Sequence, residues 1–169
     1  PEKSRVRIEK STEIIKKGVQ EIRKLSKQLI SPVLDMGLDE AIKELAEETS
    51  AASGIRFSLK KDDSEYSTIP RHLQLMVYRI VQEQFNNILK HAKAVHVHIS
   101  LSIKKNSLNL HINDDGIGFD DTKRAAGIGL RNMRSRVKLY NGSIHITSSS
   151  GKGTKLDLSI PISNAEKSI

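Results

Sequence analysis

The sequence predicts an α+β fold, in which helices cover one face of a mixed, mostly antiparallel sheet to give a two-layer α/β sandwich, preceded by a long helix. Apolar residues recur at helical spacing in residues 8–29, 37–52 and 71–91. Apolar and polar residues alternate between residues 95 and 112 and in two short runs near the C-terminus, as in strands that bury one face. Helices packed on the apolar face of such a sheet complete its core.

The N-terminal segment carries a heptad-like apolar stripe. Ile8, Ile15, Ile22 and Leu29 lie seven residues apart, a spacing that favours pairing with a second helix. Gly18 weakens this helix by ~1 kcal/mol relative to alanine. An amphipathic helix that packs on its own domain is the alternative. The segment is basic and precedes the globular body, so we expect it to dimerise or to join a helical bundle.

Pro32 marks the end of this segment, because a proline disfavours helical geometry in the residue before it. We expect three regions: residues 1–34 as a partial dimerisation segment, residues 35–163 as the globular domain and residues 164–169 as a tail. The chain begins with Pro1 rather than methionine, so we expect it to be a fragment of a longer protein.

The patterns within the globular domain predict its elements in order. They are a helix at 37–52 that stops near Gly54, a strand at 55–60, a loop at 61–68, a helix at 71–91, a hairpin of strands at 95–103 and 108–112, a helix at 131–140, and a last hairpin of strands at 144–147 and 155–160. In the helix at 71–91 the residues expected to face inward are Leu73, Val77, Ile80, Val81, Ile88 and Leu89.

Charge and composition exclude several classes of function. Residues 1–30 hold nine Lys and Arg against four Glu, so five of the +8 net charge lie there and three in the rest of the chain. No basic stripe crosses the body, so we expect no nucleic-acid partner. The absence of cysteine excludes disulfides and thiolate chemistry. No apolar run is long enough to cross a bilayer, so we expect no membrane contact by these residues. We expect a cytoplasmic location, free or as the cytoplasmic part of a membrane-bound receptor.

Polar residues interrupt the apolar helix at 71–91. Glu83 and Asn87 lie four residues apart and Lys90 follows three residues later, so the three are expected on one face. An amide oxygen beside a carboxylate suits Mg²⁺, which takes one or two protein oxygens together with waters and phosphates. A solvated polar helix face is the alternative explanation of the same pattern.

An Asp-Asp-Gly-Ile-Gly turn at residues 114–118 follows the second strand of the central hairpin. Gly116 and Gly118 allow the backbone to approach a ligand closely. A carboxylate such as Asp114 at a strand end accepts a hydrogen bond from the exocyclic amine of adenine, which distinguishes adenine from guanine. A plain hairpin turn is the alternative.

Two further glycine motifs follow. Gly-Ile-Gly-Leu at residues 127–130 leads directly into the helix expected from Arg131. Free amides at the start of a helix bind phosphate, so this motif predicts an anion site for a polyphosphate. Lys123 and Arg124 add positive charge nearby. Gly-Lys-Gly-Thr at residues 151–154 places Thr154 at the same end of the sheet.

In this order and spacing, the motifs resemble the ATP-binding fold shared by DNA gyrase, Hsp90, histidine kinases and MutL. The resemblance covers residues 73–161, about half of the chain. The sequences at 78–83 and 127–133 resemble sensor histidine kinases of the subclass that signals to response regulators with helix-turn-helix output domains. The short lid segment between Phe119 and Gly127 is also like that subclass.

The resemblance implies that residues 35–163 form a catalytic domain that binds ATP and Mg²⁺. Asn87 would be the Mg²⁺ ligand, and Asp114 would recognise adenine in a pocket shaped by Gly116 and Gly118. Glu83 matches the residue that activates water in the ATP-hydrolysing relatives; here we expect it to hold a magnesium-bound water.

The resemblance also implies a phosphate side of the site. Lys90 and His91 match positions that approach phosphate or ribose, and Thr154 matches the hydroxyl that supports the adenine-binding carboxylate. The residues expected at the lid hinge and the phosphates are Gly127, Ile128, Gly129, Leu130 and Arg131.

Residues 22–29 resemble the second helix of a dimerisation hairpin. No histidine precedes His72, which lacks the acceptor context, so we expect the phosphoacceptor outside this sequence. The resemblance implies an ATP-dependent protein-histidine kinase that forms a homodimer through its N-terminal helix and acts on a response regulator. We do not expect these residues alone to autophosphorylate. The alternatives are a non-catalytic nucleotide-binding dimer, or an ATPase in which Glu83 activates water.

The remaining histidines are expected on the solvent face of the sheet. His96 and His98 alternate with apolar residues, and the hairpin register places His111 opposite Ser100. A zinc site formed by these three imidazoles is a further alternative, weakened because no carboxylate is expected beside them. His145 is expected to face solvent in the same way.

Overall fold

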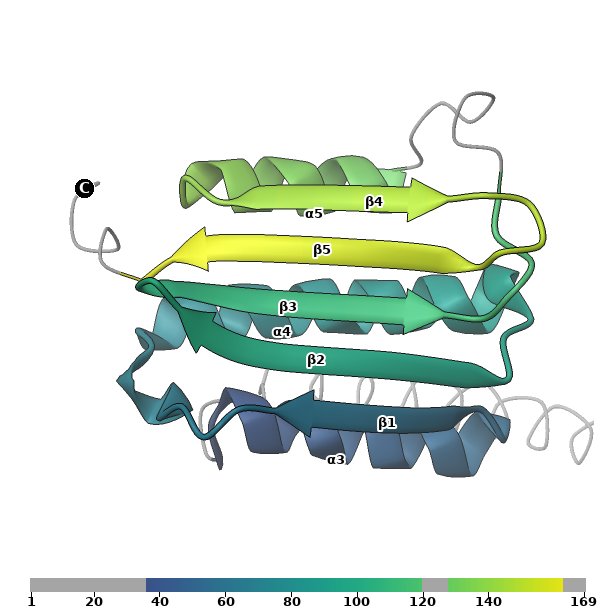
Figure 1. The fold of residues 1–169 in the computed structure, drawn as a ribbon, viewed down its shortest axis with the longest axis horizontal. Coiled ribbons are helices and arrows are strands. Elements are labelled where there is room, and N and C mark those ends of the chain that lie inside the picture. Colours follow the sequence, from purple (N-terminus) through teal and green to yellow (C-terminus); the bar gives the residue numbers. More distant parts are fainter. Residues whose placement is uncertain (1–35, 120–127, 163–169) are drawn as a thin grey trace, which may run out of the picture.

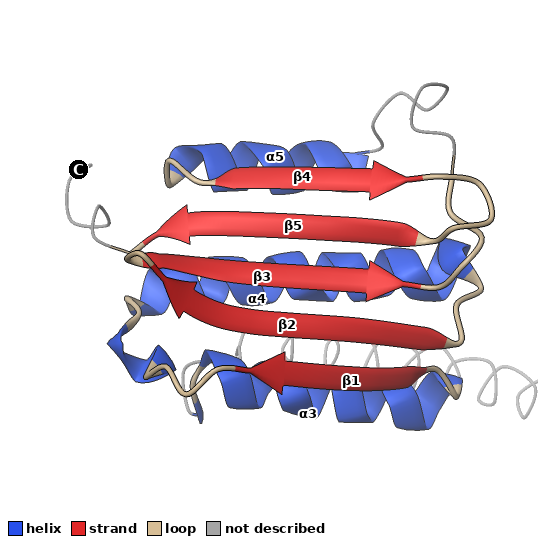
Figure 2. Ribbon diagram, in the orientation of Figure 1, coloured by secondary structure: helices blue, strands red, loops and turns tan. Residues whose placement is uncertain are grey.

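The computed structural model describes residues 36–119 and 128–162. They form one five-stranded sheet in the order β1-β2-β3-β5-β4, with helices on one face (Figures 1 and 2). β1 (Arg56–Lys61) runs parallel to β2 (His96–Lys104). The remaining pairs are antiparallel: β2 with β3 (Ser107–Asp114), β3 with β5 (Thr154–Pro161), and β5 with β4 (Ser143–Ser148). The predicted mixed, mostly antiparallel sheet is confirmed.

Three helices lie side by side behind the sheet in Figure 2, and no described element covers the opposite face. They are α3 (Leu38–Ser53), α4 (Arg71–Asn87) and α5 (Ile128–Leu139). α3 ends where the sequence predicts, because Gly54 takes a left-handed conformation and donates its N–H to the Ser50 carbonyl. No helix of the described residues is long and apolar enough to cross a membrane.

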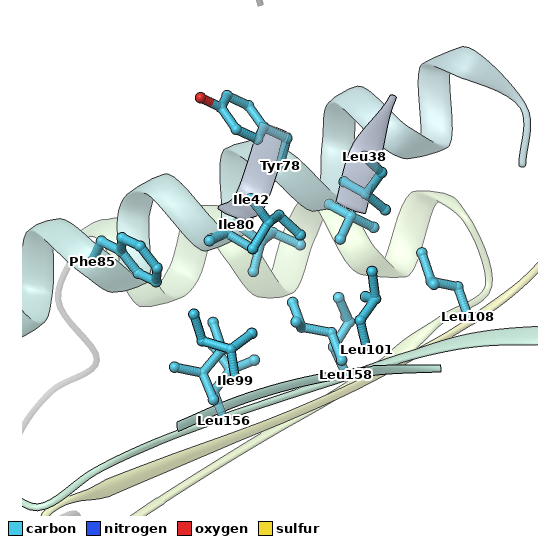
Figure 3. Close-up of a cluster of buried hydrophobic side chains, with 14 of the residues drawn as sticks. Leu38, Ile42, Tyr78, Ile80, Phe85, Ile99, Leu101, Leu108, Leu156 and Leu158 are labelled. Carbon is cyan, nitrogen blue, oxygen red and sulfur yellow. The ribbon is translucent and has the colours of Figure 1, made fainter. Parts of the chain in front are cut away.

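The core lies between the sheet and the helices. Alternate residues of β2 and β3 point toward the helices and are almost completely buried, as the strand pattern predicts. In Figure 3, Ile99 and Leu101 of the sheet face Ile42 of α3 and Ile80 of α4. Burial of each such side chain stabilises the fold by about 1.5–3 kcal/mol, so this layer supports the domain.

The predicted helix at 71–91 is divided in the structure. The α-helix stops at Asn87, and residues Ile88–Ala92 form a π-helical turn with wider winding. The wider turn keeps Ile88 buried and rotates Leu89 outward, leaving 47% of it exposed. The prediction that Leu89 faces inward is therefore wrong.

The helix predicted from Arg131 begins earlier, at Ile128. Gly129 and Leu130 thus belong to its first turn rather than to a loop before it. Glycine is tolerated there because first-turn amides need no intrahelical partner. Predictions on residues 1–34, Lys123, Arg124, Gly127 and residues 164–169 lie outside the described residues.

The loop after β1 is tied to the sheet by a tyrosine. The buried Tyr66 hydroxyl lies 2.6 Å from Asp62 Oδ1 and 2.8 Å from the Leu101 carbonyl oxygen. Asp62 also accepts backbone hydrogen bonds from Ser64 and Ile103. Burial, followed by the hydrogen bond to Asp62, raises the pKa of Tyr66, while the tyrosine hydroxyl holds the pKa of Asp62 below its usual value.

We expect Tyr66→Phe to lower the free energy of unfolding by about 1–2 kcal/mol, because a buried carbonyl and a carboxylate lose their shared donor. Urea denaturation followed by circular dichroism measures the change. Ser67→Ala, in the same turn and exposed, is the control and should be close to neutral. Equal stabilities of Tyr66→Phe and the unaltered protein would contradict this account.

Candidate functional site

A cavity of about 460 Å³ opens at one end of the sheet. Figure 1 shows that β3 and α4 end, and β5 and α5 begin, at this same end. The lining comprises Gln84, Asn87, Ile88, His91, Ala92, Asp114, Ile117, Gly118, Phe119, Gly129, Leu130, Ile146 and Thr154. Sequence motifs that are separated by tens of residues therefore meet around one cavity.

Asp114 is a buried acceptor on the cavity wall. It is the last residue of β3 and only 2% exposed. Its Oδ1 accepts the Gly116 N–H at 3.0 Å, whereas its Oδ2 has no hydrogen-bond partner within the described part of the chain. Burial raises the pKa of Asp114, and hydrogen bonds from the Gly116 and Thr154 backbone only partly offset this rise.

Two other buried side-chain oxygens of the described residues also lack a partner, Gln74 Oε1 and Asn113 Oδ1. Neither residue lines the cavity. An unsatisfied buried acceptor costs about 1–3 kcal/mol, more when charged, so a donor placed at Asp114 Oδ2 would recover that cost.

Glycines let three backbone segments converge behind Asp114. A Cβ at Gly116 would lie 2.3 Å from the Ala92 carbonyl oxygen, and one at Gly118 would lie 2.1 Å from that of Ser149. At Gly153 the added Cβ would lie 1.9 Å from the Asp114 carbonyl oxygen itself. Backbone therefore packs on backbone at all three positions.

Hydrogen bonds hold the same backbone segments together. Ile117 donates its N–H to the Ala92 carbonyl at 2.7 Å, and the Gly151 N–H reaches the Ile117 carbonyl at 2.6 Å. Ser148 Oγ accepts the Phe119 N–H at 2.9 Å and lies 3.1 Å from Thr154 Oγ1. The turn after β3 is thereby held to the π-helical turn on one side and to the β4–β5 connection on the other.

One wall of the cavity is formed by Gln84 and Asn87 of α4 and by His91 of the π-helical turn. Glu83 is half-buried beside the start of α5, and a Cβ at Gly129 would lie 2.1 Å from its Oε1. Lys90 is exposed and lies outside the lining, because the π-helical turn breaks the three-residue spacing that would have placed it on the face of Asn87.

Three other predicted site residues, Gly116, Ile128 and Arg131, are not part of the cavity lining. Gly116 is packed behind the lining, and Arg131 is exposed on the first turn of α5. Ile128 contributes the first backbone position of α5.

Several cavity residues were not among the predicted site residues. Gln84 was detectable in principle, because it stands at helical spacing among apolar residues, and the structure shows it only 3% exposed. The others are apolar and have the same sequence pattern as core residues: Ile88, Ala92, Ile117, Phe119 and Ile146.

Asp115, adjacent to Asp114, has a different environment. Its Oδ1 accepts the N–H groups of Val95 and His96, and its Oδ2 lies 2.8 Å from His96 Nδ1. The backbone hydrogen bond from His96, followed by the bond to the imidazole ring, lowers the pKa of Asp115 to about 2. Asp115 lies outside the cavity lining and organises the start of β2.

The strand histidines His96, His98, His111 and His145 lie on the open sheet face, with His111 opposite Ser100 as predicted. The expectation that no carboxylate lies beside them is wrong, since Asp115 pairs with His96 and Asp157 with His111. Asp115 lies just after β3 and Asp157 lies on β5, so spacing within one strand does not reveal either contact. Among the described residues, no group of three His, Cys, Asp or Glu side chains could hold a metal ion.

We expect Gly153→Ala to destabilise the domain and to displace Asp114, because the new methyl group meets the Asp114 backbone. Gly151→Ala is a matched control: its φ of 75° is close to the 72° of Gly153, but a Cβ there meets nothing within 4 Å. Both variants carry the left-handed strain of about 1–2 kcal/mol. Thermal denaturation should show a substantially larger loss for Gly153→Ala, and equal losses would contradict the contact.

Comparison with known proteins places this geometry in a family. The chain is 33% identical over 155 residues to the signal transduction histidine-protein kinase/phosphatase DegS of Brevibacillus brevis, covering 90% of this chain and 40% of that protein. It is 32% identical over 160 residues to the oxygen sensor histidine kinase NreB of Staphylococcus carnosus (strain TM300), covering 89% and 44%. The chain thus spans less than half the length of these relatives.

Solved structures agree on the fold. The blue-light activated histidine kinase of Erythrobacter litoralis EL346 superposes with a TM-score of 0.65 at 21% identity, over 76% of this chain and 43% of that one. Residues 72–164, more than half of the chain, match the family described as histidine kinase-, DNA gyrase B- and HSP90-like ATPase. The chain therefore belongs to this family and contains the ATP-binding catalytic domain of a sensor histidine kinase.

Proposed function

We propose that this domain binds Mg-ATP in the cavity at the end of β3 and donates the γ-phosphoryl group to a histidine on a dimerisation helix. The unpartnered Oδ2 of buried Asp114 carries the proposal. It is an acceptor that a ligand must satisfy, and it lies beside apolar Ile117 and Ile146, which suit the faces of a purine ring. The exocyclic amine of adenine is the donor that fits, whereas guanine carries a carbonyl at that ring position.

The polyphosphate belongs at the other end of the cavity, where α5 begins. Gly129 and Leu130 line the cavity from the first turn of that helix. First-turn amides are free donors at the positive end of the helix dipole, so they stabilise phosphate oxygens. In our proposal Lys90, His91, Gly127, Ile128 and Arg131 lie around the same phosphates.

Asn87 and Glu83 are the residues that would hold Mg²⁺, Asn87 directly and Glu83 through a water. An amide oxygen and a carboxylate one helical turn apart are hard ligands of the kind that Mg²⁺ prefers. Bound Mg²⁺ supplies charge neutralisation to the phosphates. The residues of this chain contribute position: Asp114 fixes the purine, and the start of α5 fixes the phosphate chain relative to the incoming imidazole.

The acceptor imidazole, the homodimer and the response regulator belong to this proposal as the partners of the whole protein. The N-terminal basic segment supplies the dimer contact, and the location is cytoplasmic. Support comes from the names of the relatives, which are sensor and signal-transduction histidine kinases.

We expect Asp114→Asn to lower the affinity for ATP by at least about a hundredfold, because an amide donor would then face the adenine amine. Asn87→Ala should reduce the affinity in Mg²⁺ to that measured in EDTA. Isothermal titration calorimetry with and without Mg²⁺ measures both effects. Asp115→Asn is the control, since its amide oxygen still accepts from Val95 and His96. Unaltered affinity in Asp114→Asn and Asn87→Ala would contradict the assignment.

Kinase activity is tested separately, with a histidine-bearing dimerisation hairpin of the parent protein supplied in trans. We expect an acid-labile phosphoryl group to appear on the hairpin when ATP and Mg²⁺ are present, and not with Asp114→Asn. Nucleotide binding without transfer would contradict the kinase proposal and identify a non-catalytic module. Steady phosphate release that is lost in Glu83→Ala would identify an ATPase instead.

A further inference from the structure

Glu83 is in direct contact with the start of α5. It lies on α4, one turn before Asn87, and its half-buried carboxylate packs against Gly129, the second residue of α5. A Cβ on Gly129 would lie 2.1 Å from Glu83 Oε1 and 3.1 Å from the carboxyl carbon. The glycine therefore leaves the space in which this carboxylate sits.

The start of α5 has no acidic residue of its own. Its first turn lacks Asp and Glu, whereas the first turn of α3 contains Asp39 and Glu40. A negative charge near the first turn stabilises a helix, because the free amides carry partial positive charge. Glu83 supplies that charge to α5 from the neighbouring helix.

The same helix end faces the cavity. Gly129 and Leu130 belong to the first turn of α5 and to the cavity lining. A carboxylate and a phosphate chain brought close to one helix end are both attracted by its partial positive charge and repel each other. Glu83 thus acts on any anion that enters this part of the cavity.

We propose that Glu83 is a positioning and specificity-determining residue: its carboxylate holds the start of α5 and competes with the nucleotide's polyphosphate for that helix end. The inference rests on the proposed ATP site and adds a role that is distinct from holding a magnesium-bound water. The effect of Glu83 on binding depends on the charge of the ligand. Glu83 weakens binding more for each additional phosphate charge and leaves the binding of the nucleoside unaffected.

The test compares ligands of increasing negative charge by calorimetry in EDTA, so that Mg²⁺ plays no part. Adenosine, ADP and ATP are titrated into the unaltered protein and into Glu83→Gln, which keeps the shape and removes the charge. We expect ATP affinity to rise about three- to tenfold, ADP affinity to rise less and adenosine affinity to stay the same. The gain should shrink at high salt, which screens the repulsion.

Glu47→Gln is the matched charge control. Glu47 is exposed on α3, at the opposite edge of the helical layer from α5 (Figure 1). Removal of its charge should leave the affinities for adenosine, ADP and ATP unchanged. An equal change for all three ligands in Glu83→Gln, or weaker ATP binding, overturns the inference. Failure of the unaltered protein to bind any of the three ligands would instead overturn the proposed function, so the two failures are distinguishable.

A double-mutant cycle tests the contact itself and needs no nucleotide. Gly129→Ala should be more destabilising in the unaltered protein than in Glu83→Ala, because only the former contains a carboxylate for the methyl group to displace. Thermal denaturation measures the four proteins. Additive effects of the two substitutions would show that Glu83 does not hold the start of α5.

Discussion

The site depends on the packing of backbone against backbone at the end of β3. The turn after this strand, the π-helical turn after α4 and the connection between β4 and β5 approach one another more closely than any side chain allows. Gly116 makes the approach to the π-helical turn, and Gly118 and Gly153 make it between the β3 end and the β4–β5 connection. These contacts hold the turn whose Gly116 N–H binds the Asp114 carboxylate, while strand pairing holds the Asp114 backbone.

This packing explains why a carboxylate with an unsatisfied oxygen is retained in a buried place. The hydrogen bond from Gly116 compensates one oxygen of Asp114 and leaves the other without a partner among the described residues. The apolar core of the domain contributes stability that offsets the free-energy cost of the unpartnered Asp114 oxygen. Asp115 shows the contrast, since both of its oxygens have partners and its pKa is lowered rather than raised. Two adjacent aspartates therefore have opposite environments: Asp114 has an unpartnered oxygen at the cavity wall, and Asp115 is fully bonded at the start of β2.

Much of the fold was predictable because its signals are local. Alternation in residues 95–112 predicted β2 and β3, and Gly54 predicted the end of α3. The Asp-x-Gly-x-Gly motif at 114–118 predicted a close backbone approach to a ligand, whereas the structure shows these glycines packed against other backbone segments. Such patterns depend on the period of a helix or a strand and on the conformational freedom of glycine, which the sequence carries directly.

Features that depend on contacts between distant segments were not predictable. The π-helical turn that exposes Leu89 is not visible in an apolar pattern, which continues through it. The contact of Glu83 with Gly129 joins α4 to α5, which are far apart in the sequence, so neither motif alone reveals it. The same holds for Tyr66, whose partner Leu101 lies on another strand. Gln84 stood in the sequence as a polar residue among apolar ones, and only the cavity explains its burial.

The central claim is that Asp114 Oδ2 accepts a hydrogen bond from the exocyclic amine of adenine. Parallel calorimetric titrations of the Mg²⁺ complexes of ATP and inosine triphosphate test it most directly, because the two nucleotides share their phosphates and sugar and differ at the amine. The account predicts that ATP binds and that inosine triphosphate, which presents a carbonyl to the carboxylate, binds at least about a hundredfold more weakly. Equal affinities would show that the buried carboxylate does not select the base and would contradict the account.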